Sequence, residues 1–184
     1  MTTIKYKSAI DSEVILTELM LPSNSNFNGK IHGGFILSLM DKAAFAAASK
    51  FSEQYCVTAS VNRVDFLNPI EVGELVTLKA RVNYVGNSSM VVGIKVDAQN
   101  IRTGIIKHCN SSYFSMVAKD EKGKSVKVPG LIISNLTELR RFLRSIKHIK
   151  MRNERNIEFS ANNFINKDYS SALNGYNVKL EINQ

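Results

Sequence analysis

The residue with the clearest chemical meaning is Asp41, because it is an acid inside the most apolar stretch of the chain. Residues 33–49 read Gly-Gly-Phe-Ile-Leu-Ser-Leu-Met-Asp-Lys-Ala-Ala-Phe-Ala-Ala-Ala-Ser. In a helix each residue advances by about 100°, so Phe45 and Ala48 fall within about 40° of Asp41, whereas Lys42 belongs to a separate polar stripe. A carboxylate on an apolar flank must find a partner or hold its proton more tightly than usual, and both conditions are typical of catalytic acids and bases. We therefore expect that Asp41 does not simply belong to the wet side of the helix and that it takes part in chemistry.

The helix that carries Asp41 is predicted over residues 34–51. Gly33 and Gly34 open it, and no helix breaker follows before the polar residues 52–54. Five other runs have the composition and alternation of strands. These runs are residues 13–21, 57–66, 75–85, 89–99 and 104–118. The sequence Gly-Asn-Ser at 86–88 predicts a hairpin between the third and fourth runs, so these two strands are expected to be antiparallel neighbours.

This order of elements predicts an α+β fold. One strand comes first, one long helix follows, and four antiparallel strands come last, so the helix is the natural cover for the dry face of the sheet. A parallel arrangement would need helices between the later strands, and the sequence leaves no room for them.

A basic extension follows the predicted body. Asn135 and Glu138 have the spacing of a capping box at a helix start, and apolar residues recur behind them at helical spacing among arginines and lysines. The apolar positions are Leu136, Leu139, Leu143, Ile146 and Ile149. We expect an amphipathic basic helix whose apolar stripe docks on the body or on another subunit. The predicted division is one domain of residues 1–130 and an extension of residues 131–184.

Composition narrows the class of protein further. With 184 residues and 44% hydrophobic content the chain can bury a core of ordinary size. No apolar run approaches the roughly 20 residues of a membrane span, and the first residues lack an apolar signal core, so we expect a cytoplasmic protein. Cys56 and Cys109 have no metal-ligand spacing and are expected to be reduced core or strand residues. The net charge of +8 is densest in the extension, where a solvated helix face is favoured over a nucleic-acid surface.

Several short motifs together resemble the hotdog-fold acyl-CoA thioesterases. More narrowly, they resemble the broad-range cytosolic acyl-CoA hydrolases of bacterial and brain type, from about residue 10 to about residue 130. The motifs are Leu21-Pro22, Asn26, Gly29, Ile31-His32-Gly33-Gly34, Leu39-Met40-Asp41, Val57–Val61 and Asn87–Met90. The resemblance implies a long helix wrapped by a five-stranded antiparallel sheet, which agrees with the order of elements.

The resemblance also implies catalytic roles. Asp41 would act as a general base toward water or as a direct nucleophile, and the sequence leaves both open. The amide of Asn26 would hold the water or donate to the thioester carbonyl, and the N–H of Gly34 at the helix start would stabilise developing negative charge. Thr58 would orient the water or the carboxylate. In the family, the asparagine and the aspartate face each other across a homodimer interface, so a monomer should be inactive.

Acyl-CoA is the substrate that the resemblance implies, and its coenzyme part needs positive charge and loop donors. The predicted binding residues are His32, Gly33, Arg63, Asn87, Ser88 and Ser89. We expect His32 to contact the ligand rather than to transfer a proton. No metal or cofactor is expected, since thioester hydrolysis needs only an activated water, a polarised carbonyl and a place for the leaving thiolate.

Two further readings stay open at this point. The chain could be a non-catalytic sensor that binds acyl-CoA and uses its basic tail on a partner or on nucleic acid, because a fold does not fix a function. The presence of both Asn26 and Asp41 favours the enzyme. The tail could also bind a regulatory nucleotide or stabilise a trimer of dimers, and no membrane partner is expected.

Overall fold

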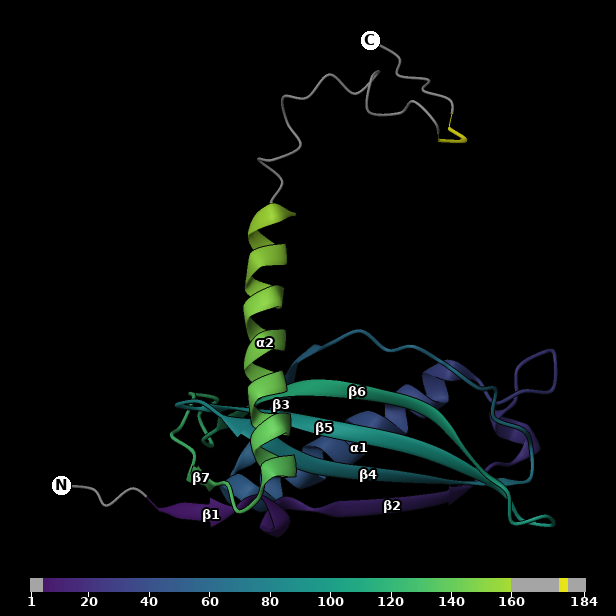
Figure 1. The fold of residues 1–184 in the computed structure, drawn as a ribbon, viewed down its shortest axis with the longest axis horizontal. Coiled ribbons are helices and arrows are strands. Elements are labelled where there is room, and N and C mark those ends of the chain that lie inside the picture. Colours follow the sequence, from purple (N-terminus) through teal and green to yellow (C-terminus); the bar gives the residue numbers. More distant parts are fainter. Residues whose placement is uncertain (1–4, 160–175, 179–184) are drawn as a thin grey trace. The chain divides into compact units, whose positions relative to one another are not determined.

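A computed structural model describes residues 5–159 and 176–178 of the chain. Figure 1 shows its elements, which are two long helices, seven strands and two short 3-10 turns within the described residues. In chain order they are β1 (Tyr6–Ser8), η1 (Ala9–Ser12), β2 (Val14–Leu19), η2 (Pro22–Asn24), α1 (Gly33–Ser52), β3 (Tyr55–Val61), β4 (Glu74–Val85), β5 (Ser89–Asn100), β6 (Ile106–Lys119), β7 (Gly130–Ile132) and α2 (Leu136–Glu158).

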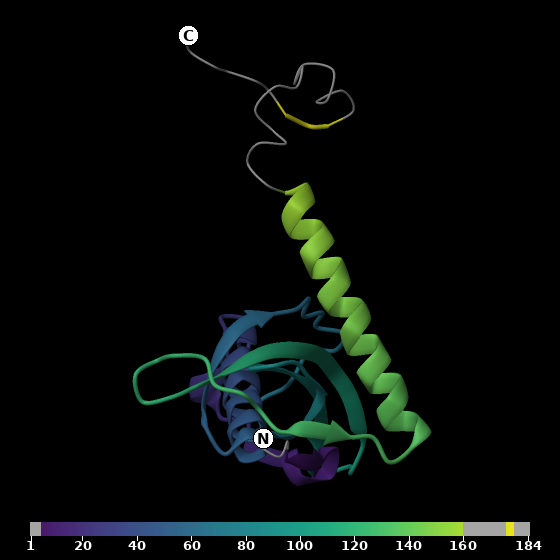
Figure 2. The ribbon, with the colours of Figure 1, turned by 90° about the vertical axis from the view of Figure 1, so that its left-hand side faces the viewer.

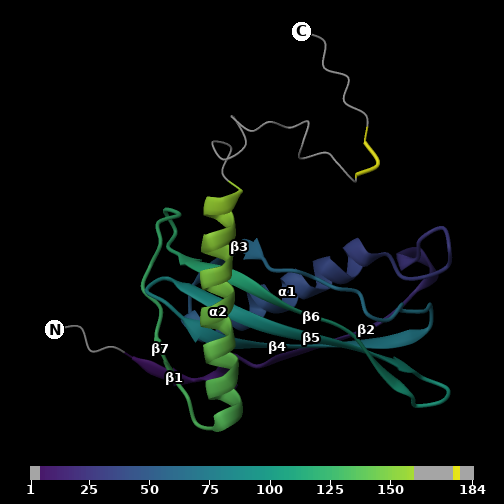
Figure 3. The same cartoon turned by 45° about the horizontal axis from the view of Figure 1, so that its top comes forward.

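Five strands form one antiparallel sheet in the order β2-β4-β5-β6-β3. The sheet curls around α1, as Figure 2 shows, and α1 lies along the strands in Figures 1 and 3. The predicted α+β architecture, one long helix covered by a five-stranded antiparallel sheet, is therefore confirmed.

Small side chains let α1 approach the sheet closely. Ala43, Ala44, Ala47 and Ala48 are all fully buried, and Phe51 fills the end of the same face. The facing strand residues are those of the predicted alternation, which puts every second side chain on the dry face. They include Val76, Leu78, Ala80, Val82, Val92, Val96 and Ala98. The core therefore lies between α1 and the concave face of the sheet.

The strand predicted over residues 57–66 is too long. β3 ends at Val61, and after it only two backbone bonds within the described chain reach β6, from Asn62 N–H to the Tyr113 carbonyl and from Leu67 N–H to the Cys109 carbonyl, both at 2.9 Å. The physical reason is topology: β3 is an edge strand beside β6, so the chain must leave the sheet to reach β4. The short parallel pair β1 and β7 was not predicted, because three residues in each strand are too few to show an alternation.

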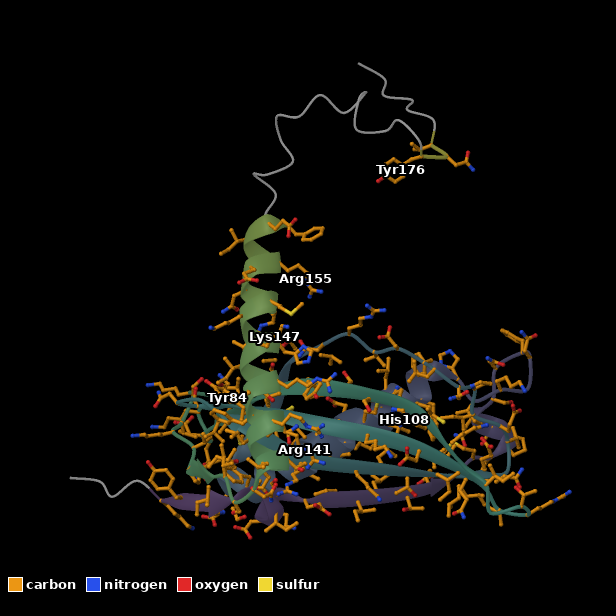
Figure 4. All side chains as sticks on the ribbon, viewed as in Figure 1. Tyr84, His108, Arg141, Lys147, Arg155 and Tyr176 are labelled. Carbon is orange, nitrogen blue, oxygen red and sulfur yellow. The ribbon has the colours of Figure 1, made fainter. Side chains whose placement is uncertain are left out.

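The first half of α2 contacts the sheet through polar and aromatic side chains. Asn135 caps the helix as predicted, since its Oδ1 accepts the N–H of Glu138 at 3.0 Å. Glu138 forms an ion pair with Arg81 of β4 and accepts the N–H of Ser134 at 2.7 Å. The ring centroid of Phe142 lies 5.3 Å from that of Tyr84, which is labelled in Figure 4.

The apolar stripe predicted for this helix does not dock on the body. Leu136, Leu139 and Leu143 are 83%, 40% and 55% exposed. The reason is that the ion pair of Glu138 and the ring of Phe142 set which side of the helix meets the sheet. Docking of these leucines on another subunit, the other alternative, stays a prediction.

By its internal contacts the chain divides into two compact units, residues 1–147 and 148–184. The predicted domain of residues 1–130 and extension of residues 131–184 stay a prediction, and most of the extension beyond Phe159 lies outside the described residues. Among the residues that the structure describes, no helix is both long and apolar enough to cross a membrane.

Candidate active site

Asp41 and Thr58 are brought together as the sequence predicts. Thr58 Oγ1 donates to Asp41 Oδ1 over 2.6 Å, and it also lies 3.4 Å from the sulfur of Met116. Asp41 stands on the third turn of α1, and Thr58 stands where the register of β3 shifts against β6. The hydrogen bond fixes one oxygen of the carboxylate and leaves the second oxygen for another ligand.

Asp41 lies at the edge of the buried face of α1, and the dimer interface that is expected to cover it stays a prediction. The side chain of Asp41 is exposed, and so are those of Lys42, the next residue, and Phe45, one turn further along the helix. The buried face of α1 runs through Met40, Ala44 and Ala48, so Asp41 falls at its border. Helical angles place a residue relative to its neighbours, but they do not show which side the sheet covers.

Asn26 is held in a tight loop that orients its amide. Its Oδ1 accepts the backbone N–H groups of Asn28 at 2.9 Å and Lys30 at 3.2 Å. The loop closes through a bond from Asn26 N–H to the Lys30 carbonyl at 2.7 Å and through Gly29, whose φ of 72° suits glycine. Because the side-chain oxygen is used inside the loop, the NH₂ group points outward as a donor. Within the described chain this group has no hydrogen bond to Asp41.

His32 is the N-cap of α1, and sequence reasoning missed this role. Its Nδ1 accepts the backbone N–H of Gly34 at 3.0 Å. The imidazole must therefore be neutral, with its proton on Nε2. The predicted oxyanion donor is engaged in this conformation, and a thioester oxygen would have to displace the imidazole. The signal in the sequence was the position of a polar residue directly before the glycine pair that starts the helix.

Gly33 provides a second backbone donor at the same helix end. Its N–H has no hydrogen bond to another described residue, as expected for the first turn of a helix. A Cβ on Gly33 would lie 3.2 Å from the ring of Phe66, so glycine lets this ring approach the helix start. The helix start therefore offers positive backbone dipoles beside an aromatic ring.

The distance along α1 separates the two halves of the predicted site. Gly34 and Asp41 are seven positions apart in the sequence, which corresponds to about 10 Å along the helix axis. One carbonyl group, about 1.2 Å long, cannot contact the Gly34 N–H and the Asp41 carboxylate of the same helix at once. Within one chain, therefore, the Gly34 N–H and the Asp41 carboxylate do not contact the same carbonyl group.

The predicted coenzyme residues are spread over the molecule. Arg63 is exposed and forms an ion pair with Asp65 at 2.8 Å. Asn87, Ser88 and Ser89 form the β4–β5 hairpin as predicted, where Gly86 N–H binds the Ser89 carbonyl at 2.7 Å. The loop before α1 is bound to the chain just before β4, where the Ile70 carbonyl accepts the Ile31 N–H. The hairpin lies at the opposite end of β4 and β5, which have 12 residues each. Within one chain, the structure does not bring the hairpin to Asn26 or His32.

A cavity of about 590 Å³ opens near the C-terminal end of α1. Its lining includes Ser49, Tyr55 and Val57. Phe45 lies one helical turn after Asp41, and its ring contacts that of Tyr55 with centroids 5.8 Å apart. Along this side of α1, Phe45 therefore stands one turn after Asp41 and one turn before Ser49, which lines the cavity. Its partner Tyr55 lines the same cavity.

Cys56 and Cys109 are buried free thiols, as predicted. Burial raises the pKa of the Cys109 thiol, so this residue stays protonated and serves the core rather than chemistry. Among the described residues, no group of three or more His, Cys, Asp or Glu side chains is arranged to hold a metal ion.

A long helix enclosed by a curled five-stranded antiparallel sheet defines a hotdog fold, and comparisons with known proteins agree with it. The family model of the thioesterase superfamily matches residues 28–105. Protein VdlD of Helicobacter pylori is 41% identical over 141 residues, which cover 77% of this chain and 80% of that protein. YkhA of Bacillus subtilis, named as an acyl-CoA thioester hydrolase, is 34% identical over 132 residues, covering 72% of this chain and 77% of that protein. This chain therefore belongs to the acyl-CoA thioester hydrolases of the thioesterase superfamily.

Solved structures give the same family. An apo-hexameric acyl-CoA thioesterase superposes with a TM-score of 0.80 at 33% identity, covering 83% of this chain and 97% of that one. An acyl-CoA hydrolase of Staphylococcus aureus, solved with butyryl coenzyme A and coenzyme A, has a TM-score of 0.77 at 29% identity and covers 83% of this chain and 93% of its own. Three further structures of that hydrolase carry alanine in place of one asparagine, one aspartate and one threonine.

Proposed function

We propose that this protein hydrolyses acyl-CoA thioesters to a free acid and coenzyme A. The observation that carries the proposal is the exposed Asp41 carboxylate, held at 2.6 Å by Thr58 in a chain of the acyl-CoA thioester hydrolase family. One oxygen of Asp41 is fixed by the threonine, and the other is open to a water molecule. A carboxylate placed in this way can take a proton from water as the water attacks the thioester carbon.

The carbonyl oxygen is proposed to bind at the start of α1. The Gly34 N–H donates to it after the His32 imidazole turns away, and the outward NH₂ group of Asn26 donates beside it. Both donors act on the negative charge that develops on the oxygen, and the positive end of the helix adds to the effect. The leaving thiolate needs no metal or cofactor in this scheme.

Two chains are proposed to build each active site, because about 10 Å separates Gly34 from Asp41 along one helix. The surface near Asp41 also favours a second copy. β3 is an edge strand of the sheet, and its first and last residues, Tyr55 and Val61, are 62% and 43% exposed. An unpaired strand edge with exposed apolar side chains is a surface that a second strand can cover. We expect the partner chain to supply Asn26 and Gly34 to the Asp41 of this chain.

The variants of the Staphylococcus aureus hydrolase support this assignment of residues. In that enzyme the substituted asparagine, aspartate and threonine are separated by 15 and 17 positions. Asn26, Asp41 and Thr58 have the same separations here. Coenzyme A is proposed to contact His32, Gly33 and Arg63 and, from a neighbouring chain, the hairpin of Asn87, Ser88 and Ser89.

The direct test is turnover of a series of acyl-CoAs, from acetyl to palmitoyl, by wild type, Asn26→Ala and Asp41→Ala. We expect free thiol and acid to form with wild type and turnover to fall by at least about 100-fold in Asp41→Ala. Undiminished turnover in Asp41→Ala would remove the mechanism. Tight acyl-CoA binding without turnover by wild type would favour the sensor reading instead.

A single turnover in ¹⁸O-water separates the two roles left open for Asp41. If Asp41 is a general base, the label enters only the acid product. If Asp41 attacks directly, water that opens the anhydride at the Asp41 carboxyl carbon puts the label into Asp41 itself, which peptide mass spectrometry detects and which a general base cannot produce.

The assembly proposed for this chain is a homo-oligomer of dimers, supported by the hexameric state of the superposed thioesterase. A trimer of dimers follows by analogy with it. A regulatory nucleotide, a role for nucleic acid and a cytoplasmic location stay predictions.

A further inference from the structure

A second hydrogen-bonded cluster lies on the outer face of the sheet, on the side opposite to α1. Ser111 Oγ lies 3.2 Å from His108 Nε2, and His108 Nδ1 lies 3.0 Å from Asp97 Oδ1. Figure 4 labels His108 on the sheet. The same atoms join the nucleophile, the base and the orienting acid in a serine hydrolase triad. The proposed thioester site uses none of these three residues.

A β-bulge brings the cluster together. Asp97 pairs with His108 and Lys95 pairs with Ser111, and the register of β5 against β6 shifts between Val96 and Asp97. Cys109 is the extra residue on β6. His108 and Ser111 are three positions apart in the sequence, so on a regular strand without a bulge they would point to opposite faces. The bulge turns both toward the outer face.

The charge on Asp97 favours an arrangement of protons that suits a nucleophilic serine. Burial raises the pKa of Asp97, but hydrogen bonds from Lys95 and His108 outweigh this effect and lower its pKa overall. An ionised Asp97 accepts from His108 Nδ1–H, and in the neutral form of this tautomer Nε2 carries the lone pair and can accept the hydroxyl proton of Ser111. The basic nitrogen therefore faces the hydroxyl group.

The surroundings of Ser111 are open to solvent. Ser111 is exposed, and Ile106, two residues before His108 on β6, is 64% exposed. Lys95 stands directly opposite Ser111, and its ammonium lies 2.7 Å from Asp97 Oδ2. A cation at this position can also attract a negative oxygen that forms beside Ser111.

We propose that Ser111 is a nucleophile that accepts an acyl group from activated esters or thioesters, with His108 as its general base and Asp97 as the residue that orients His108. Ser111 Oγ attacks the carbonyl carbon while His108 Nε2 takes the hydroxyl proton. The carbonyl electron pair moves to oxygen and returns as the bond to the leaving group breaks. The leaving thiolate or phenolate takes the proton from Nε2, so the products are acyl-Ser111 and a free thiol or phenol.

The test uses a fluorophosphonate, which forms a bond from phosphorus to an activated serine oxygen and loses fluoride. The full chain and its Asp41→Asn variant are labelled in parallel, and the labelled peptides are mapped by mass spectrometry over time. The same labelling is expected in both, so the result is independent of the thioester site. Ser23 is the internal control, because it is exposed and has no hydrogen bond to a histidine in the described chain.

We expect Ser111 to be labelled at least about tenfold faster than Ser23. This factor is smaller than the rate enhancement that a general base usually contributes. The label should be absent in Ser111→Ala and at least about tenfold slower in His108→Gln, which keeps a hydrogen-bonding amide but no base. Asp97→Asn is a second variant and should also slow the reaction. An unlabelled Ser111, a rate equal to that of Ser23, or a rate unchanged in both His108→Gln and Asp97→Asn would overturn the proposal.

Discussion

His32 Nδ1 accepts the backbone N–H of Gly34 at 3.0 Å, so the N-cap of α1 occupies the donor that the proposed mechanism offers to the thioester oxygen. The two roles exclude each other at any moment, because one N–H cannot bind the imidazole and the carbonyl with full strength. Stability of the helix start and binding of the carbonyl are therefore expected to compete.

Substitutions of His32 should move stability and catalysis in opposite directions. His32→Ala removes the cap, which costs about 0.5–2 kcal/mol of stability, and frees the Gly34 N–H. We expect a lower Tm together with a kcat higher by about two- to fivefold, because the freed N–H acts on charge that develops in the transition state. His32→Asp supplies a better cap whose carboxylate repels the developing negative charge. We expect a Tm equal to or above that of wild type and kcat/KM lower by at least about tenfold.

Thermal unfolding and steady-state kinetics on the same preparations check this prediction. If His32 only stabilises the helix, activity will follow Tm in both variants, with the alanine variant the weaker enzyme. That result would remove Gly34 as the carbonyl donor, while leaving the role of Asp41 untouched.

Thr58 is expected to matter through one hydroxyl group. Thr58→Val has nearly the same shape but cannot donate to Asp41 Oδ1, so the carboxylate is free to turn. We expect kcat to fall about tenfold with little change in Tm, and Thr58→Ser to retain most of the activity as the matched control. Equal activity of the valine and serine variants would contradict a positioning role for the hydroxyl.

Mixing two inactive variants tests whether sites are built from two chains. If Asn26 of one chain serves Asp41 of another, a mixed dimer of Asn26→Ala and Asp41→Ala contains one site with both residues intact. Random pairing then restores about a quarter of wild-type activity in the mixture and about half in the purified mixed dimer. Co-expression with two affinity tags, purification of the mixed species and acyl-CoA assays measure this value. No recovery in the mixed species would mean that each site lies within one chain.

The ring of Phe45 is expected to limit acyl length. It contacts Tyr55 between Asp41 and the cavity of about 590 Å³ at the end of α1. Phe45→Ala opens the way to that cavity, so the ratio of kcat/KM for long over short acyl chains should rise by about tenfold, since each buried CH₂ contributes about 0.8 kcal/mol. Ile15→Ala, which removes an exposed apolar side chain from β2, is the control. An unchanged ratio would place the acyl chain elsewhere.

The sequence predicts the fold well because each large element has its own pattern. Residues 75–85 and 89–99 alternate, and the helix with Asp41 is rich in alanine, so their types are local properties. The position of β3 beside β6 is not local. Nothing in residues 55–61 states which strand they pair with, and the partner follows from the long connection after Val61.

The candidate site also has some features that local motifs predict and others that depend on the three-dimensional packing. The closeness of Asp41 and Thr58 was predicted from motifs and is present, whereas the exposure of Asp41 depends on which face of α1 the sheet covers. The His32 cap depends on a side-chain rotamer, and the His108 cluster depends on a single extra residue in β6. Geometry of this kind is set by packing and register, which one sequence does not state.

Glu138 should make the attachment of α2 depend on pH. The Ser134 N–H lowers the pKa of Glu138 below its ordinary value of 4.5, and Arg81 lowers it further. A carboxyl group with a lowered pKa in the folded protein contributes stability above its unfolded pKa and loses that contribution as pH falls through the folded value.

We expect Glu138→Gln to lose about 1–2 kcal/mol of unfolding free energy at pH 7, and the difference from wild type to shrink below about pH 4.5. Denaturant unfolding between pH 3 and 8 measures it, with the exposed Glu121→Gln as control, and a difference independent of pH would show that lost packing, not the charge, destabilises the variant.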